Sequence, residues 1–233
     1  ASTMRSLGMG LVPSIHPLEM DDNRVALATA YALGAPPMVP WDTYIGNEEK
    51  GKAKRYFGKA EELSDIYRFA RQHRELLDGR ELDAVVGIVV PVDKFKGKAA
   101  EVSELIGRLA ALQIPFAFVP TGGTVRPLPF DAARLEHFKA LVVTHGEADY
   151  DATTVAALRR SRVQRLGLSQ VDGAVLAGLQ PFQLAPGAET VRLFPRSVPG
   201  QSKQLELHVI DTTRGAWPLA ETGCKRRLAI RNE

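Results

Sequence analysis

One valine-rich apolar run constrains the fold of this chain more than any other feature. The segment DAVVGIVVPV, at residues 83–92, carries no polar side chain after Asp83. A continuous apolar run of this length, rich in β-branched residues, is typical of a strand that is buried on both faces. Such burial is found where helices cover both sides of a parallel sheet. The run therefore predicts a strand of an α/β domain.

The segments that follow this run alternate between strand and helix patterns. The further strands are expected at 115–121, 139–146 and 164–169, and the helices at 99–113, 130–137 and 151–161. Strands that alternate with helices of this length imply βαβ units and a parallel sheet. Residues 80–180 therefore predict a small three-layer α/β domain of the Rossmann-like or flavodoxin-like kind.

A different pattern, in the order helix, strand, loop and helix, precedes this domain in residues 1–79. Two aspartates open an Ala- and Leu-rich helix at 24–33, Gly34 ends it, and Pro36-Pro37 prevents its continuation. The next elements are expected to be a short strand at 38–44, a polar loop at 46–59 and an amphipathic helix at 60–77. We expect this segment to be distinct from the α/β domain.

The last piece, residues 181–233, changes character again. Apolar and polar residues alternate in 189–196 and in 203–211, and the segment SVPGQS between them is turn-like. This pattern predicts an antiparallel hairpin with one face in solvent. Residues 226–232 could add a third strand. So few strands do not form a stable sandwich alone, so we expect them to lean on the α/β domain or to belong to a larger sandwich.

Composition excludes several classes of partner and cofactor. The net charge of +3 is too small, and its charges too interleaved, to predict a nucleic-acid partner. Cys224 is the only cysteine, so neither an intrachain disulfide nor a usual zinc site is expected. No membrane span and no signal peptide are visible, although the chain opens with Ala1 rather than Met, so the compartment stays open between cytoplasmic and secreted or periplasmic. Gly122-Gly123 lacks the dinucleotide fingerprint, and we expect no cofactor.

The first piece also carries a family resemblance. The stretches RVALATAYALGAPPMVPWDTYI (24–45) and RYFGKAEELSDIYRFAR (55–71) resemble the last turns of TIM-barrel glycoside hydrolase-like proteins. The similar proteins are related to bacterial β-galactosidases whose barrel is followed by a Rossmann-like trimerisation domain and a small β-sandwich. The chain shows this order of pieces, so the resemblance implies the tail of a (β/α)8 barrel at 1–79, the assembly domain at 80–180 and a partial sandwich at 181–233.

The resemblance implies a carbohydrate site at the end of the last barrel strand. Trp41 would stack on a sugar ring, Asp42 would accept hydrogen bonds from hydroxyl groups, and Tyr44 and Arg55 would support the same rim. The alternative is that Trp41 packs under the following loop and Asp42 caps a turn. Retaining and inverting glycosidases both need two facing carboxylates, and no such pair can be assembled here. The catalytic carboxylates are therefore expected outside this chain, which would be inactive alone and would work as a homo-oligomer or as part of a larger polypeptide.

Other readings stay open. The chain could be a non-catalytic carbohydrate-binding or oligomerisation module. A small phosphate-handling enzyme is the second alternative, because Lys94, Lys96 and Lys98 follow a strand and precede a helix, where anions bind. His145, with two acids close behind it, is a weak metal candidate, and a polar loop is the preferred interpretation, so no metal is expected.

Overall fold

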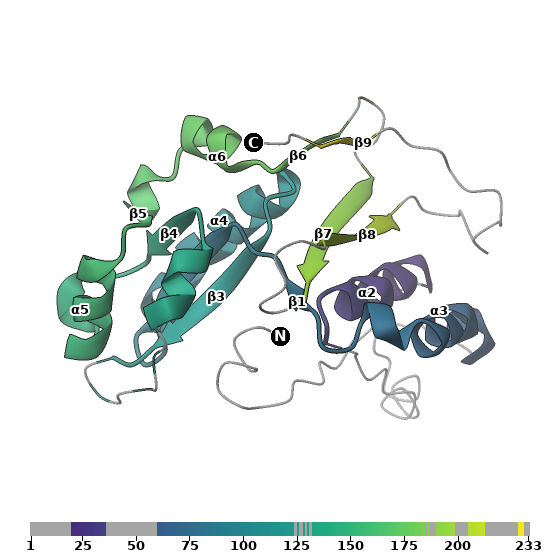
Figure 1. Cartoon of the computed structure of the whole chain (residues 1–233), viewed down its shortest axis with the longest axis horizontal. Coiled ribbons are helices and arrows are strands. Elements are labelled where there is room, and N and C mark those ends of the chain that lie inside the picture. Colours follow the sequence, from purple (N-terminus) through teal and green to yellow (C-terminus); the bar gives the residue numbers. More distant parts are fainter. Residues whose placement is uncertain are drawn as a thin grey trace, which may run out of the picture. The chain divides into compact units, whose positions relative to one another are not determined.

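The computed structural model describes residues 20–35, 60–123, 125, 128, 130, 132–184, 186, 190–198, 205–212 and 228–230. These residues form helices, one parallel sheet and antiparallel strands, which confirms the α/β class (Figure 1). They divide into two compact units. The helix–hairpin unit holds the described residues before position 82 and those within 187–225, and the α/β unit holds those within 82–186 and 226–233. The first unit thus draws on both ends of the chain.

Four parallel strands form the sheet of the α/β unit, in the order β3-β2-β4-β5. The strands are β2 (Val86–Pro91), β3 (Phe116–Thr121), β4 (Ala140–Val143) and β5 (Gln164–Gly167). All six residues of β2 are buried, which confirms that the valine-rich run is a strand covered on both faces. β2 also has a neighbour on each side, since Ile88 pairs with Phe118 in β3 and with Val142 in β4.

Helices cover both faces of this sheet. α4 (Ala99–Ala111) and α6 (Gly173–Leu179) share one core with strand residues that include Ile88 and Val142. α5 (Ala152–Arg160) and the 3₁₀ helix η5 (Ala132–His137) share a second core with Val89 and Leu141. Successive residues of one strand therefore serve different cores, as the alternation of strand side chains requires. The predicted helix at 130–137 is this 3₁₀ helix, and α6 was not predicted.

Aspartate caps begin the two helices that follow β4 and β5. Asp151 accepts a hydrogen bond from the backbone N–H of Thr154 at 2.8 Å, and Asp172 accepts one from that of Val175 at 2.9 Å. An aspartate in this position satisfies one of the free N–H groups of the first helical turn. The start of α5 is for this reason readable in the sequence to within a residue or two.

A pair of short strands lies at the C-terminal end of the α/β unit. β6 (Phe182–Leu184) pairs antiparallel with β9 (Leu228–Ile230). Residues 226–232 thus do contain a strand, but its partner is β6 and not the predicted hairpin. Alternation within one strand gives no information about which strand lies beside it.

The helix–hairpin unit contains two helices that pack on each other. α2 (Met20–Ala32) contributes Leu27, and α3 (Ala60–Gln72) contributes Leu63 and Ile66, to one small core. The rings of Tyr31 and Tyr67 meet edge to face beside it, with their centroids 6.5 Å apart. The predicted helix at 60–77 ends at Gln72 and is followed by the 3₁₀ helix η3 (Arg74–Leu76). The predicted strand at 38–44 and loop at 46–59 lie outside the described residues.

The predicted hairpin is confirmed in the same unit. β7 (Val191–Ser197) and β8 (Leu205–Asp211) run antiparallel, and β1 (Glu81–Leu82) extends the sheet in the order β1-β7-β8. Arg80, next to β1, forms an ion pair with Glu206 of β8 at 2.6 Å. This ion pair connects the segment that follows α3 to β8, the outer strand of the hairpin.

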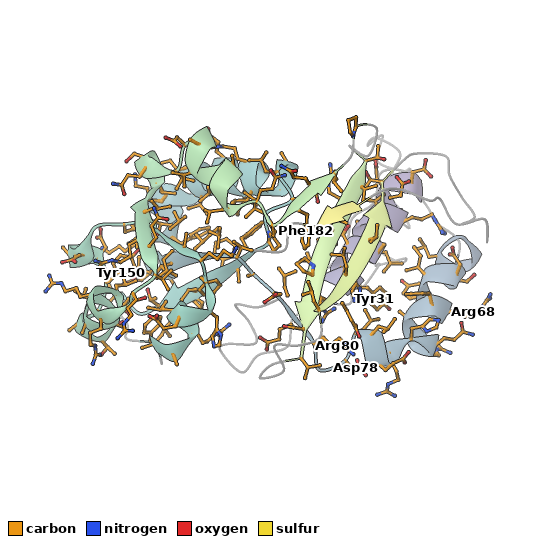
Figure 2. All side chains as sticks on the ribbon, turned by 45° about the horizontal axis from the view of Figure 1, so that its top comes forward. Tyr31, Arg68, Asp78, Arg80, Tyr150 and Phe182 are labelled. Atoms are coloured by element: carbon orange, nitrogen blue, oxygen red, sulfur yellow. The ribbon has the colours of Figure 1, made fainter. Side chains whose placement is uncertain are left out.

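A buried arginine joins the hairpin to the helices. Arg196 of β7 is only 1% exposed. Its guanidinium donates to the carbonyl oxygens of Tyr31 and Ala32 at the end of α2, at 3.2 and 3.3 Å. It also donates to the carbonyl oxygen of Leu77, at 3.1 Å, and to that of Arg80. Figure 2 labels Tyr31 and Arg80, two of the residues whose carbonyls the guanidinium binds. Carbonyls at the end of a helix lack partners within the helix and carry partial negative charge, so a cation is stabilising there.

Candidate functional site

The residues predicted to line a sugar site are not among those that the structure describes. Trp41, Asp42, Tyr44 and Arg55 all fall within 36–59. Their arrangement stays a prediction. The described residues include the polar side chains that follow the carboxyl ends of the parallel strands.

The carboxyl ends of β2 and β4 mark the place where an open α/β sheet normally binds ligands. The chain passes from β2 to β3 on one side and then to β4 on the other, so the strand order changes direction at β2. Helices on the two sides of such a point run away from each other and leave a crevice outside the strand ends. The side chains that follow β2, β3 and β4 are therefore the first candidates for function.

Asp93, which follows β2, contacts the segment that follows β3. Its Oδ2 accepts a hydrogen bond from the backbone N–H of Val125 at 3.0 Å. A Cβ on Gly123 would lie 1.7 Å from Asp93 Oδ1, so the carboxylate occupies the space that any other residue at 123 would need. The double glycine after β3 thus accommodates an aspartate from the neighbouring strand end.

His145, which follows β4, contacts the segment that follows β2. Its Nε2 lies 3.1 Å from the carbonyl oxygen of Lys94, and because a carbonyl only accepts, Nε2 carries the hydrogen in this bond. Its Nδ1 lies 2.8 Å from the hydroxyl of Thr144. Both ring nitrogens are therefore engaged within the protein, and the imidazole bridges the exits of two neighbouring strands.

The hydroxyl of Tyr150 links the backbone of β2 to the backbone of His145. It donates to the carbonyl oxygen of Val89 at 3.1 Å and accepts from the backbone N–H of His145 at 3.2 Å. Burial raises the pKa of the Tyr150 phenol above its ordinary value, because the ionised form would lose its solvation. Tyr150 is thus a neutral structural group at neutral pH. The sequence analysis missed it, and its only signal was a tyrosine immediately before a capping aspartate.

The lysines proposed for phosphate lie on the exposed exit of β2. Lys94 precedes the 3₁₀ helix η4 (Phe95–Lys98), and none of the residues of η4 is buried. The ammonium group of Lys98 forms an ion pair with Glu101 of α4, at 2.8 Å. Among the described contacts, no two of these ammonium groups share a protein acceptor, and the phosphate site stays a prediction.

Two further functional classes can be addressed for the described part of the chain. The described residues contain no group of three or more His, Cys, Asp or Glu side chains that could hold a metal ion, and His145 contacts Thr144 and Lys94 rather than the acids behind it. Within the same residues, no helix has the length and apolar character needed to cross a membrane.

Comparison with protein-family models, with curated proteins and with solved structures finds no match to this chain. Function must therefore be argued from the residues themselves.

Proposed function

We propose that this chain is the C-terminal portion of a glycoside hydrolase-like protein, in which residues 41–55 complete a carbohydrate site and the α/β unit mediates assembly. The order of the elements supports the proposal: a helix pair, then a three-layer unit, then a hairpin. The strand order β3-β2-β4-β5, with helices on both faces, is also that of the first four strands of a flavodoxin-like domain. The catalytic carboxylates lie outside this chain.

The observation that carries the proposal is apolar surface on the helix pair. If α2 and α3 are the last helices of a barrel, part of their surface should be left without its neighbours. Phe69 of α3 is 53% exposed and Leu33, just after α2, is 40% exposed. Barrel neighbours of the two helices would cover these exposed apolar side chains.

The closed carboxyl edge of the α/β unit supports an assembly role for that unit. A general base or nucleophile must present a free hydrogen-bonding group to its substrate. Here Asp93 binds a backbone N–H, His145 is engaged at both ring nitrogens, and Tyr150 binds Val89. These contacts make the edge a rigid surface, which suits protein contacts better than catalysis.

Binding of sugars by the Trp41 variant tests the proposal. The natural full-length polypeptide is isolated from its source, its intact mass is measured, and its affinity for a panel of mono- and oligosaccharides is determined by calorimetry. Trp41→Ala should weaken binding about two- to tenfold, because an aromatic stacking contact is worth about 0.5–1.5 kcal/mol. Trp217→Ala, at the other tryptophan, is the matched control and should leave affinity unchanged.

Three results would count against the proposal. Absence of binding to any sugar would remove the carbohydrate site, and unchanged affinity in Trp41→Ala would remove Trp41 from it. A native mass equal to the 25.4 kDa of this chain would leave no room for the catalytic carboxylates and would favour a non-catalytic binding or assembly module. Stabilisation by phosphate that Lys96→Ala abolishes would favour the phosphate-handling alternative.

A further inference from the structure

A run of arginines lies at the end of α5 and continues into β5. The segment RRSRVQR, residues 159–165, contains four arginines in seven positions. No Asp or Glu occurs between Asp151 and Asp172, so the run is not interleaved with acids as most basic residues of this chain are. Short arginine-rich runs of this kind are typical of sites for polyanions.

The structure places all four arginines on the surface. Arg159 and Arg160 close the last turn of α5, Arg162 lies in the connection, and Arg165 lies in β5, and each is exposed. Among the described strands, β5 pairs only with β4, so it is an edge of the parallel sheet. The arginines therefore follow one continuous path from the end of a helix to the edge of a sheet.

Nearby carboxylates compensate only part of this charge. Glu147 binds Arg159 through two contacts, of 3.3 and 2.5 Å, and these hydrogen bonds hold the pKa of Glu147 below its ordinary value. Glu136 accepts from the hydroxyl of Ser161, at 2.7 Å, and from the backbone N–H of Arg162. Of these two carboxylates, only Glu147 contacts a guanidinium group of the run in the described contacts, because Glu136 binds the Ser161 hydroxyl and the Arg162 backbone.

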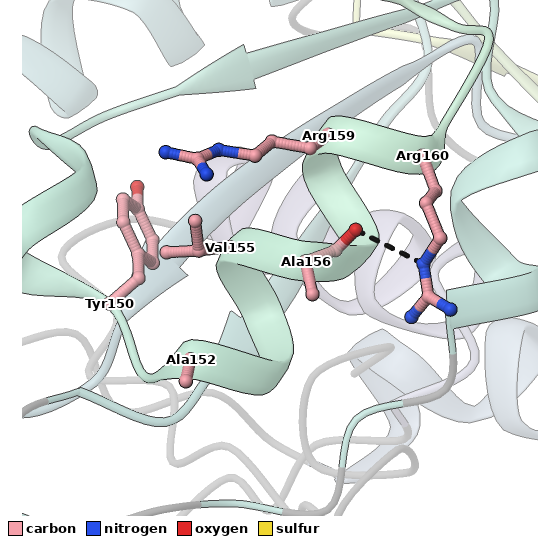
Figure 3. A pocket seen from close by; sticks show the side chains of 6 residues that line it. All are labelled: Tyr150, Ala152, Val155, Ala156, Arg159 and Arg160. Carbon is pink, nitrogen blue, oxygen red and sulfur yellow. Dashed lines mark hydrogen bonds between the residues drawn. The ribbon is translucent and has the colours of Figure 1, made fainter.

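A shallow, open surface depression lies along α5, and Arg159 and Arg160 line it (Figure 3). Small side chains form its floor, namely Ala152, Val155 and Ala156. The Arg159 side chain extends across Val155 toward Tyr150, whereas Arg160 lies on the other side and donates to the carbonyl oxygen of Ala156 at 3.2 Å. An elongated ligand could lie on this floor with guanidinium groups on both sides.

We propose that residues 159–165, with the depression on α5, bind a linear polysaccharide that carries carboxylate or sulfate groups. Guanidinium groups recognise such oxyanions through paired, charge-assisted hydrogen bonds. Single-stranded nucleic acid offers similar charge but is normally held by base stacking on exposed aromatic rings. Tyr150, the aromatic residue that lines the depression, is only 5% exposed and cannot serve as a stacking platform. This site goes beyond the carbohydrate site proposed at residues 41–55 and does not depend on it.

Binding of the full chain to heparin and to polygalacturonate tests the proposal, with the two ligands separating sulfate from carboxylate recognition. The triple variant R160A/R162A/R165A should bind at least tenfold more weakly at about 50 mM salt and should show a shallower salt dependence. The control R68A/R71A/R74A removes three exposed arginines, two from α3 and one from the adjoining η3, and causes the same change of net charge. The affinity of this control variant for both polysaccharides should stay within about twofold of that of the unmodified chain.

A second variant tests the local arrangement rather than the charge alone. Glu147→Gln releases Arg159 from its internal partner, so it should strengthen polysaccharide binding by about two- to fivefold. Absence of salt-dependent binding to both polysaccharides would overturn the proposal, as would equal losses in the two triple variants. Tighter binding of single-stranded DNA than of either polysaccharide would replace it with a nucleic-acid site.

Discussion

At the scale of single residues, several positions are explained only by a neighbour from elsewhere in the chain. Gly87 lies in the middle of β2, and a Cβ there would approach the ring of Phe138 to 2.8 Å. At Gly123, the carboxylate of Asp93 occupies the position that a Cβ atom would take. Neither glycine has a positive φ, so it is close approach and not backbone conformation that requires them. Glycine at such positions is a packing requirement.

Gly123→Ala should therefore destabilise the α/β unit. The new methyl group would displace the Asp93 carboxylate and break its bond to Val125, at a cost of about 1–3 kcal/mol in the free energy of unfolding. The matched control is Gly107→Ala in α4, where no atom lies within 4 Å of the added Cβ. That variant should gain up to about 1 kcal/mol, because alanine is the better helix former. Chemical denaturation measures both, and a neutral Gly123→Ala would contradict the observed contact.

At the scale of elements, charged side chains link the β7–β8 hairpin to its surroundings, in addition to buried apolar residues such as Val191 and Leu193. Arg196 binds four backbone carbonyls, and Arg80 pairs with Glu206. His208 lies on the same strand as Glu206 and is half-buried. Burial lowers the pKa of His208, and the positive charge of Arg196 lowers it further, in spite of the opposing effect of Glu206. The folded state therefore favours the neutral form of the His208 imidazole.

The hairpin should lose stability in mild acid. A histidine whose pKa is lower in the folded state binds its proton more readily when unfolded, so unfolding is favoured as the pH falls below the unfolded value of about 6.5. The stabilisation is complete above that pH and declines until the pH reaches the folded pKa. His208→Gln should remove this part of the pH dependence between about pH 7.5 and pH 5. Hydrogen exchange of the β7 and β8 amides at both pH values checks it, and an equal acid response in the variant would show that His208 is not the group responsible.

At the scale of the whole molecule, the division into two units predicts separate responses to core damage. Arg196→Met leaves four carbonyls without their cation and should cost the helix–hairpin unit about 3 kcal/mol or more. Leu141→Ala removes a side chain that is 0% exposed from the sheet of the α/β unit and should cost about 2–5 kcal/mol there. Residue-resolved hydrogen exchange should show faster exchange in the damaged unit only. Equal acceleration in both units for either variant would mean that the chain unfolds as one cooperative body.

Elements whose signals are local could be predicted from the amino-acid sequence. The apolar run of β2, the alternation in β7 and β8 and the aspartate before α5 each reflect burial or capping within a few residues. The partners of these elements, in contrast, depend on the folded chain. There β9 pairs with β6, Arg196 lies at the end of α2, and His145 contacts Lys94. These contacts link positions far apart in the chain, and hydrophobic periodicity reports which face of an element is buried but not what covers it. The arginine path at 159–165 was equally present in the sequence, but its exposure along α5 and the edge strand became visible only in the folded chain.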